Sequence, residues 1–166
     1  ALAAMCAALL TDEDLILENV PDISDVDSLG ALLVSLGAEV ERLPNRAVRL
    51  NCRQVNIFEA PTDLISENRA SFQVMGPLVA RHGYAASAPP GGDVIGQRPI
   101  DVHLSGFEAM GARVTREGER FVATAANGLH GARVFMDYPS VSGTRNVMMA
   151  AVLARGHVTI VNAATE

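Results

Sequence analysis

The sequence of 166 residues contains no tryptophan, only two cysteines and no long uninterrupted apolar run. Because Asp12, Glu13 and Asp14 interrupt the apolar stretch near the start, no segment approaches the roughly 20 apolar residues that a membrane-spanning helix needs. Neither a membrane anchor nor a signal peptide is recognisable. Cys6 and Cys52 have no neighbours at metal-ligand or redox spacing, so we expect both to be buried thiols in a reducing cytoplasm.

Basic residues are also scarce, because 13 Lys and Arg face 19 Asp and Glu, which gives a formal charge of −6. A surface that follows a phosphate backbone needs clustered basic side chains, so we expect no nucleic-acid partner. An apolar content of 49% and the length of the chain suit one packed domain. The opening run Ala1–Leu10 resembles a helix interior without an N-cap signal, and we therefore expect a piece of a longer protein.

An internal repeat organises the chain with a period of about seventy residues. Three methionines, each followed four residues later by an aliphatic residue, mark it: Met5 with Leu9, Met75 with Val79, and Met149 with Leu153. After each pair, an apolar helix is expected to lead into a strand. Such repetition means that each unit leaves an apolar face exposed until its neighbours cover it, so three units would close around their helices.

Within the first two units the apolar spacing predicts helices over 26–36 and 100–110. Gly37 and Gly111 follow them at the position that favours left-handed backbone. Each helix is followed by a predicted hairpin, which pairs 39–42 with 47–50 and 113–116 with 120–123. One unit is thus helix, strand, helix, strand, strand. For the third unit the sequence predicts only a helix over 142–154 and a strand over 158–161.

Residues 90–103 form a glycine-rich loop that carries Asp93 and leads through Arg98 into a helix started by Pro99. Glycine gives such a loop access to positive φ, and it can move as a lid. Arginine offers a planar charged fork for phosphate or carboxylate, and the free N–H groups at the helix start face the same side. The loop therefore places an acid beside an anion-binding site. The alternative is that Asp93 only stabilises the turn, as aspartate after two glycines often does.

The order Pro-Gly-Gly-x-x-Ile-Gly-x-Arg-Pro-x-Asp-x-His resembles the catalytic loop of the UDP-N-acetylglucosamine enolpyruvyl transferases. Further segments resemble that family in the expected order: 19–21 with 25–27, 60–64, 68–71, 76–81, 136–141 and 162–164. The resemblance implies an inside-out α/β barrel lobe of the α+β kind, in which βαββ-type repeats surround central helices. Periodicity alone also allows a layered α/β sandwich. The resemblance further implies repeats over about 1–60, 61–136 and 137–166, the last incomplete, and a second lobe that this chain lacks.

The resemblance implies transfer of the enolpyruvyl group of phosphoenolpyruvate to the 3-hydroxyl of UDP-N-acetylglucosamine, with release of phosphate. This is the first committed step of peptidoglycan precursor synthesis in the cytoplasm, and it needs no metal or organic cofactor. Asp93 stands where most members carry cysteine and a minority carry aspartate. It is the expected acid that protonates the methylene carbon. An exposed aspartate has a pKa near ~3.9, so enclosure with two anionic substrates must raise that pKa. Because fosfomycin alkylates the cysteine, an aspartate also implies resistance.

The resemblance also assigns substrate contacts. Arg98 would face phosphoenolpyruvate, and Arg69 the phosphates and sugar of the nucleotide, since both tasks suit bidentate charged donors. Pro99, Ile100 and Val102 would contact the uracil. Asp101 would either meet the uracil or cap its helix.

Ser140, Val141 and Ser142 match a turn that cradles the diphosphate, and an ordinary serine N-cap is compatible with that task. His103 is expected to be a packed, hydrogen-bonded histidine, because nothing gives it metal-ligand spacing.

Some residues depart from the family pattern. Tyr138 stands where the family often has lysine, and Ser142-Gly143-Thr144 where it often has Gly-Ala-Thr. A Lys-Asn pair expected before Ala1 and the catalytic aspartate of the second lobe are not in this chain, so we expect the chain alone to be inactive. Two alternatives stay open: a relative that acts on shikimate-3-phosphate, and a non-catalytic paralogue that binds nucleotide sugars.

Overall fold

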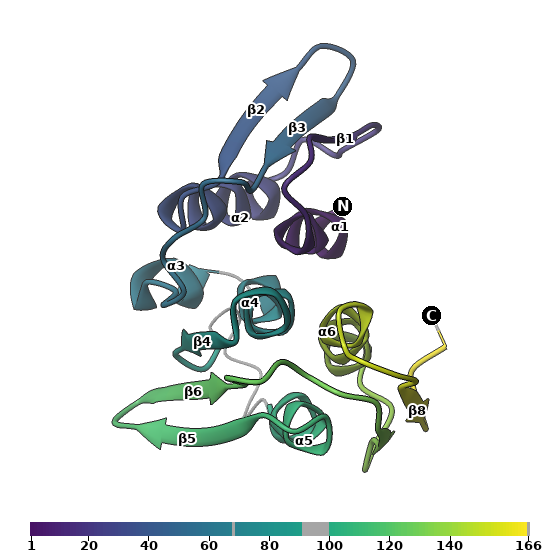
Figure 1. The fold of residues 1–166 in the computed structure, drawn as a ribbon. Coiled ribbons are helices and arrows are strands. Elements are labelled where there is room, and N and C mark those ends of the chain that lie inside the picture. The colour runs from purple at the N-terminus through teal and green to yellow at the C-terminus, as the bar shows by residue number, and fades with distance from the viewer. Residues whose placement is uncertain (68, 91–99, 166) are drawn as a thin grey trace.

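The first two repeats contain the same five elements in the same order, as the sequence predicts (Figure 1). The computed structural model describes residues 1–67, 69–90 and 100–165, without the side chains of 66–69. The first repeat consists of α1 (Leu2–Ala7) with its 3₁₀ continuation η1 (Ala8–Leu10), β1 (Leu15–Leu17), α2 (Ser24–Ser35), β2 (Glu39–Leu43) and β3 (Ala47–Asn51). The second consists of α4 (Met75–His82), β4 (Tyr84–Ser87), α5 (Asp101–Ala109), β5 (Arg113–Glu117) and β6 (Arg120–Thr124).

Five further elements lie outside this shared pattern: α3 (Thr62–Glu67) and η2 (Arg69–Val74) before α4, and β7 (Arg133–Phe135), α6 (Val141–Val152) and β8 (Thr159–Val161) at the end. The sequence predicts α6 and β8 but not β7. Only Val134 of β7 is buried, and three residues are too few to show an alternating pattern. β7 and β8 pair in parallel.

The two repeats build sheets of identical topology, because the last strand of each repeat lies in the middle. The strand orders are β1-β3-β2 and β4-β6-β5, and all neighbours are antiparallel. The predicted hairpins are confirmed. In the first, three residues join the strands, and Asn45 and Arg46 among them have positive φ, 60° and 58°. In the second, Gly118 supplies the positive φ of 63°.

Helices lie inside and sheets outside. Figure 1 shows α1, α2 and α4 between the β1-β3-β2 sheet at one end and the β4-β6-β5 sheet at the other. The predicted apolar stripe of α2 is buried, with every member at most 2% exposed: Val26, Leu29, Leu32, Leu33 and Leu36. In the stripe of α5, Phe107 and Met110 are fully buried and Leu104 is half-buried. This arrangement agrees with the predicted inside-out α/β fold.

Glycine ends both long helices of the repeats in the predicted way. Gly37 and Gly111 have φ values of 102° and 95°. In each case the next residue folds back, so that Ala38 N donates to Leu33 O and Ala112 N to Phe107 O, both at 3.0 Å. Left-handed backbone at this position satisfies carbonyls that the helix end leaves free. Both turns therefore send the chain into the following strand.

Cys6 and Cys52 are free and buried, as predicted. Burial raises the pKa of the Cys6 thiol to about 12 and that of Cys52 to about 11, so both stay protonated at neutral pH. Across residues 1–67, 69–90 and 100–165, no helix has the length and apolar character needed to cross a bilayer.

A close helix contact in the core joins α4 to α6. The N–H of Gly76 donates to Asn146 Oδ1 at 2.8 Å. A Cβ on Gly76 would lie 2.3 Å from Asn146 O and 2.4 Å from Asn146 Oδ1. Because one of these atoms belongs to the backbone, a side chain larger than hydrogen would force the two helices apart.

Gly76→Ala should therefore destabilise the protein by about 1–3 kcal/mol, the usual cost of overpacking a core. Thermal or urea unfolding of the full-length protein would measure the loss. Gly30→Ala is the matched control, because its new Cβ would meet only Val40 Cγ1 at an ordinary 3.6 Å and the helix would gain up to about 1 kcal/mol in propensity. Equal stability of the two variants would contradict the close contact of α4 and α6.

Candidate functional site

Helices α5 and α6 run side by side in the same direction and begin together. Val102 of α5 lies against Gly143 of α6, and four residues later in each helix Gly106 of α5 lies against Val147 of α6, as expected for parallel helices. A Cβ on Gly143 would lie 2.7 Å from Val102 Cγ2, and one on Gly106 would lie 2.4 Å from Val147 Cγ2. Two adjacent helix N-termini present free N–H groups and partial positive charge at one place, which favours an anion there.

A hydrogen bond links the first residue of α5 to the segment before α6. Tyr138 Oη donates to Asp101 Oδ1 at 2.8 Å. Burial and the carboxylate of Asp101 raise the pKa of Tyr138 to about 12, so the hydroxyl stays a donor at neutral pH. The N-cap of α5 is Ile100, and it carries no side-chain capping bond. Asp101 Oδ1 accepts this bond, and the two roles predicted for Asp101, contact with the uracil and capping of the helix, both stay predictions.

Ser140 is the N-cap of α6, as one of the two predicted roles requires. Its Oγ accepts a hydrogen bond from Gly143 N at 3.1 Å, and Thr144 N donates to Ser140 O at 2.8 Å. These bonds fix the turn through Val141 and Ser142, both half-buried, at the start of the helix. The cap therefore uses the N–H of Gly143.

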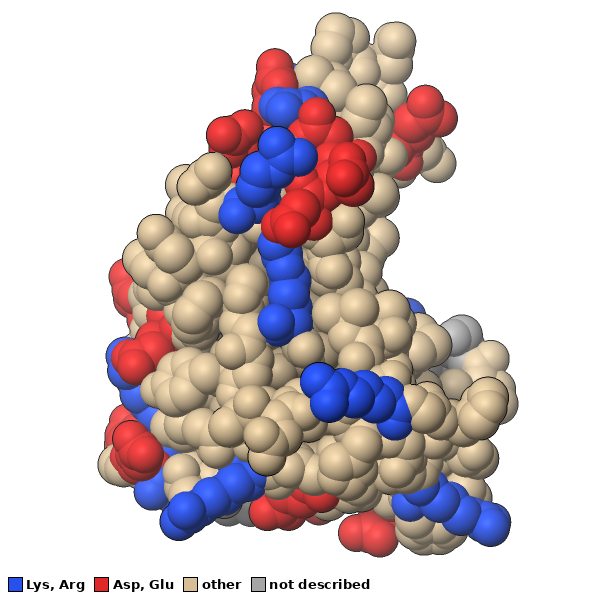
Figure 2. All heavy atoms as spheres, in the orientation of Figure 1, with Lys and Arg blue, Asp and Glu red and all other residues tan. Residues whose placement is uncertain are grey.

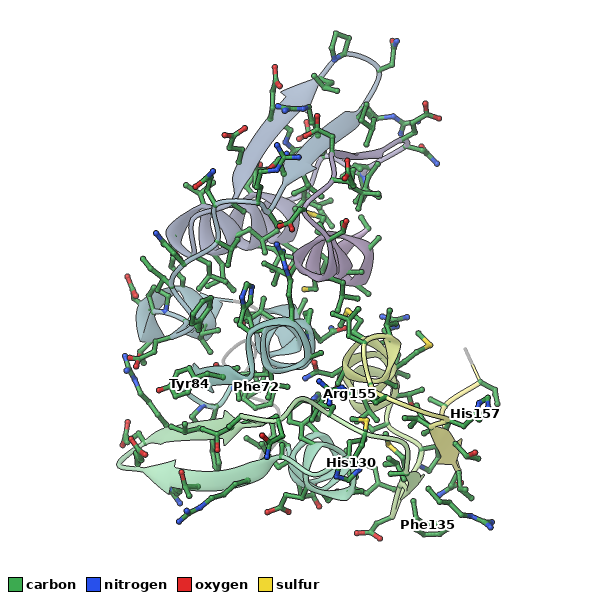
Figure 3. All side chains as sticks on the ribbon, viewed as in Figure 1. Phe72, Tyr84, His130, Phe135, Arg155 and His157 are labelled. Carbon is green, nitrogen blue, oxygen red and sulfur yellow. The ribbon has the colours of Figure 1, made fainter. Side chains whose placement is uncertain are left out.

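A buried polar layer lies directly beneath the two helix starts. His103 is 3% exposed and Asn146 is fully buried, and His103 Nδ1 lies 2.9 Å from Asn146 Nδ2. On its other side, His103 Nε2 lies 3.3 Å from Ser142 Oγ. Figure 3 shows Phe72 in the interior beside α4. The Phe72 ring meets the His103 ring edge-on, with the ring centroids 5.3 Å apart. His103 is therefore the packed, hydrogen-bonded histidine that the sequence predicts.

Burial lowers the pKa of His103 to about 4, despite the opposing charge of Asp101. The imidazole is consequently neutral at physiological pH. A neutral ring in this place can orient neighbouring groups but does not add positive charge to the site.

The structure brings six of the ten predicted site residues together at the starts of α5 and α6: Ile100, Asp101, Val102, Ser140, Val141 and Ser142. Asp93, Arg98 and Pro99 lie outside the described residues. Arg69 begins η2, but its side chain is outside the description as well. The roles of these four residues stay predictions.

Asn146, the residue that connects the buried layer, is not among the residues predicted from the sequence. The signal was present, since Asn146 is a polar residue on the apolar face of α6 between Gly143 and Ala150, all three of them buried. A buried amide with no hydrogen-bonding partners would be costly, so an asparagine at such a position predicts a polar network.

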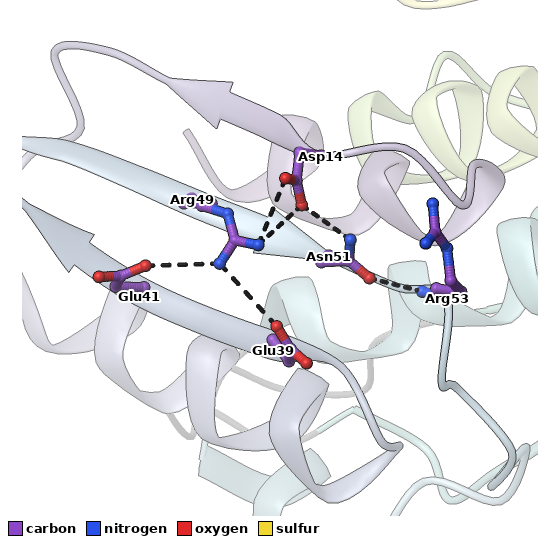
Figure 4. A network of polar contacts seen from close by, with 6 residues as sticks. All are labelled: Asp14, Glu39, Glu41, Arg49, Asn51 and Arg53. Atoms are coloured by element: carbon purple, nitrogen blue, oxygen red, sulfur yellow. Dashed lines mark hydrogen bonds and ion pairs between the residues drawn. The ribbon is translucent and has the colours of Figure 1, made fainter.

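A second polar cluster lies far from these helix starts, on the β1-β3-β2 sheet (Figure 4). It lines a hollow of about 430 Å³. Arg49 stands at its centre and pairs with Asp14 at 3.0 Å, Glu41 at 3.4 Å and Glu39 at 3.9 Å. The bond from Asn51, followed by those from Arg49, lowers the pKa of Asp14. These charges satisfy one another at the surface, where such pairs contribute little stability.

The charge distribution gives no basic face on the side drawn in Figure 2, where arginines lie singly or beside acidic side chains. Within the described parts of the chain, no group of three or more His, Cys, Asp and Glu residues is placed to hold a metal ion.

Comparison with known proteins finds relatives along the whole length of this chain. The family model of EPSP synthase (3-phosphoshikimate 1-carboxyvinyltransferase) matches residues 1–166. Three curated proteins named UDP-N-acetylglucosamine 1-carboxyvinyltransferase are similar along the whole chain. That of Finegoldia magna is 43% identical over 166 residues, that of Gluconobacter oxydans 46% over 165, and that of Shewanella sp. strain MR-7 44% over 166. These matches take in 99–100% of this chain but only 39–40% of each relative, so the chain spans about two fifths of their length.

Two solved structures share the fold. The enolpyruvyl transferase NikO from Streptomyces tendae has a TM-score of 0.81 at 18% identity, over 96% of this chain and 37% of its own. EPSP synthase from Acinetobacter baumannii has a TM-score of 0.70 at 15% identity, over 92% of this chain and 36% of its own. Since the family model covers every residue and the curated relatives exceed 40% identity, the chain belongs to the EPSP synthase (3-phosphoshikimate 1-carboxyvinyltransferase) family of enolpyruvyl transferases.

Proposed function

We propose that the protein containing this chain transfers the enolpyruvyl group of phosphoenolpyruvate to the 3-hydroxyl of UDP-N-acetylglucosamine and releases phosphate, the first committed step of peptidoglycan precursor synthesis. The observation that carries the proposal is the 43–46% identity with UDP-N-acetylglucosamine 1-carboxyvinyltransferases along the whole chain. The paired helix starts support it, because both substrates are anions and helix N-termini attract anions.

In this reaction Asp93 delivers a proton to the methylene carbon of phosphoenolpyruvate while the sugar hydroxyl oxygen bonds to the neighbouring carbon. The hydroxyl proton passes to a base, for which the resemblance offers an aspartate of the second lobe. Loss of phosphate and of one methyl proton then gives the enolpyruvyl ether. Arg98 holds phosphoenolpyruvate and Arg69 the nucleotide, each through a charged fork.

The nucleotide sugar lies against the two helix starts in this proposal. Ile100 and Pro99 give apolar contacts to the uracil, Val102 contributes its backbone because its side chain is buried against α6, and Asp101 is the polar group beside them. Ser140, Val141 and Ser142 surround the diphosphate at the N-terminus of α6, where helix amides and hydroxyls suit phosphate oxygens.

The described repeats form part of one lobe, and the rest of the protein supplies the remainder of the third repeat and a second lobe. Exposed apolar side chains on and just after α6 support this division: Met148 is 53% exposed, Val152 63% and Leu153 42%. Surfaces of this kind are normally covered by a neighbouring unit in a repeat fold. The buried, free thiols of Cys6 and Cys52 suit the reducing cytoplasm, where we place the enzyme.

The full-length protein should release phosphate from phosphoenolpyruvate when UDP-N-acetylglucosamine is present and not when shikimate-3-phosphate replaces it. Asp93→Asn should lower kcat by about 10²–10⁴-fold, the usual contribution of a general acid. A phosphate-release assay measures both. Activity with shikimate-3-phosphate would instead favour the second family activity, and binding of the nucleotide sugar without phosphate release would identify a non-catalytic binder. An unchanged rate in Asp93→Asn would remove the role of Asp93 as the acid.

Fosfomycin should not inactivate the full-length enzyme, because a carboxylate is a poorer nucleophile than a thiolate toward this alkylating agent. Asp93→Cys should become sensitive, with activity that falls progressively during preincubation with fosfomycin. Asp93→Ser is the control variant, since it matches cysteine in size but lacks the soft sulfur. Progressive inactivation of the unmodified protein, or an Asp93→Cys variant that keeps its activity, would contradict the placement of residue 93 at the reacting centre.

A further inference from the structure

The amide of Asn146 has only one orientation that its neighbours allow. Gly76 N can only donate, and it lies 2.8 Å from Oδ1. Phe72 O can only accept, and it lies 3.2 Å from Nδ2. Exchanging oxygen and nitrogen would therefore create two unfavourable contacts in a fully buried place. Nδ2 of Asn146 must be the atom that faces His103.

This orientation fixes the tautomer of His103. Both hydrogens on Asn146 Nδ2 are donated, one to Phe72 O and the other to His103 Nδ1 at 2.9 Å. Nδ1 must therefore carry a lone pair rather than a proton. In a neutral imidazole the single proton then lies on Nε2, which is 3.3 Å from Ser142 Oγ. The low pKa of His103, which follows from its burial, agrees with a neutral ring.

The tautomer in turn decides what Ser142 can do. The Nε2–H of His103 donates to Ser142 Oγ, so one lone pair of the hydroxyl is occupied from inside the protein. A serine hydroxyl has one proton to donate, and near a helix start it commonly gives that proton to local backbone. Because Ser142 Oγ accepts from His103, its hydroxyl proton must point away from the imidazole ring and is available to a group outside the helix. Ser142 is the second residue of α6 and is half-buried, so such a group can reach it.

We propose that His103 is a positioning residue, which holds the Ser142 hydroxyl as a hydrogen-bond donor toward the diphosphate of the nucleotide substrate. The inference rests on the proposed function for the identity of that substrate. Phosphate oxygens only accept hydrogen bonds, so they bind a serine whose proton is free far better than one whose proton is already used. The chain of donors runs from Asn146 through His103 and Ser142 to the ligand.

The test compares variants of the full-length enzyme that keep one end of the His103 ring and lose the other. His103→Asn places an amide near Nδ1, so it keeps the bond from Asn146 and loses the bond to Ser142. His103→Gln extends to the position of Nε2 and can still donate to Ser142. Ser142→Ala removes the hydroxyl itself. The KM for UDP-N-acetylglucosamine should rise about tenfold in Ser142→Ala and in His103→Asn, as expected for one hydrogen bond to a charged group, and should stay near the unmodified value in His103→Gln.

Because His103 acts through Ser142, the double variant His103→Asn with Ser142→Ala should have the same KM as Ser142→Ala alone. An increase equal to the product of the two single effects would overturn the proposal, as would equal losses in His103→Asn and His103→Gln. Unchanged KM in both Ser142→Ala and His103→Asn would overturn it while leaving the proposed function intact. A parent protein that does not bind UDP-N-acetylglucosamine would overturn both.

Nitrogen NMR of the unmodified protein, with His103→Gln to assign the signal, tests the tautomer without any activity measurement. The proposal requires a proton on Nε2 and none on Nδ1 at neutral pH. A proton on Nδ1, or a doubly protonated ring, would overturn it.

Discussion

The buried amide of Asn146 is the interaction on which the arrangement of the helices depends. It bonds to Gly76 at the start of α4, to Phe72 in η2 and to His103 in α5, while Asn146 itself belongs to α6. A buried amide that loses its partners costs several kcal/mol, of order 2–7 depending on the reference state. Any relative movement of these four segments would break at least one of its bonds. The amide therefore holds α5 and α6 in register and places their first turns side by side.

Arg81 makes the corresponding connection between the first two repeats. Its Nη1 donates to three carbonyls of the first repeat, those of Leu9 at 2.9 Å, Thr11 at 3.0 Å and Cys52 at 3.1 Å. Its Nη2 pairs with Asp12. The rigid guanidinium suits a task that requires several acceptors at fixed directions. Arg81, at the end of α4, is thus bonded to the residues at and just after the ends of η1 and of the first hairpin. These bonds help to fix the orientation of the first repeat relative to the second.

The parts of the fold that follow from local patterns could be predicted, and the parts that follow from distant pairs could not. The apolar stripe of α2, the glycine after each helix and the two hairpins depend on residues a few positions apart. β7 depends on pairing with β8, more than twenty residues later, and the bond between Gly76 and Asn146 joins residues 70 positions apart. Residues 100–102 and 140–142 could be assigned to one site from the resemblance alone. That their helices run parallel and share a polar layer required the structure, because no short-range pattern encodes a contact between helices.

The starts of α5 and α6 also limit how the site can bind negative charge. All 13 basic residues of the chain are arginines, and Tyr138 is a neutral donor because its pKa lies near 12. His103 beneath the helix starts is neutral too. Among the described residues here, Tyr138 and His103 therefore add no positive charge, and the donors are helix amides and hydroxyls. Amides and hydroxyls are directional and carry no net charge, so they discriminate by geometry more than by Coulomb attraction. The contribution of these amides and hydroxyls should therefore depend on the aim of donors such as Ser142, which the buried network fixes, while the proposed arginine contacts would carry the dependence on ionic strength.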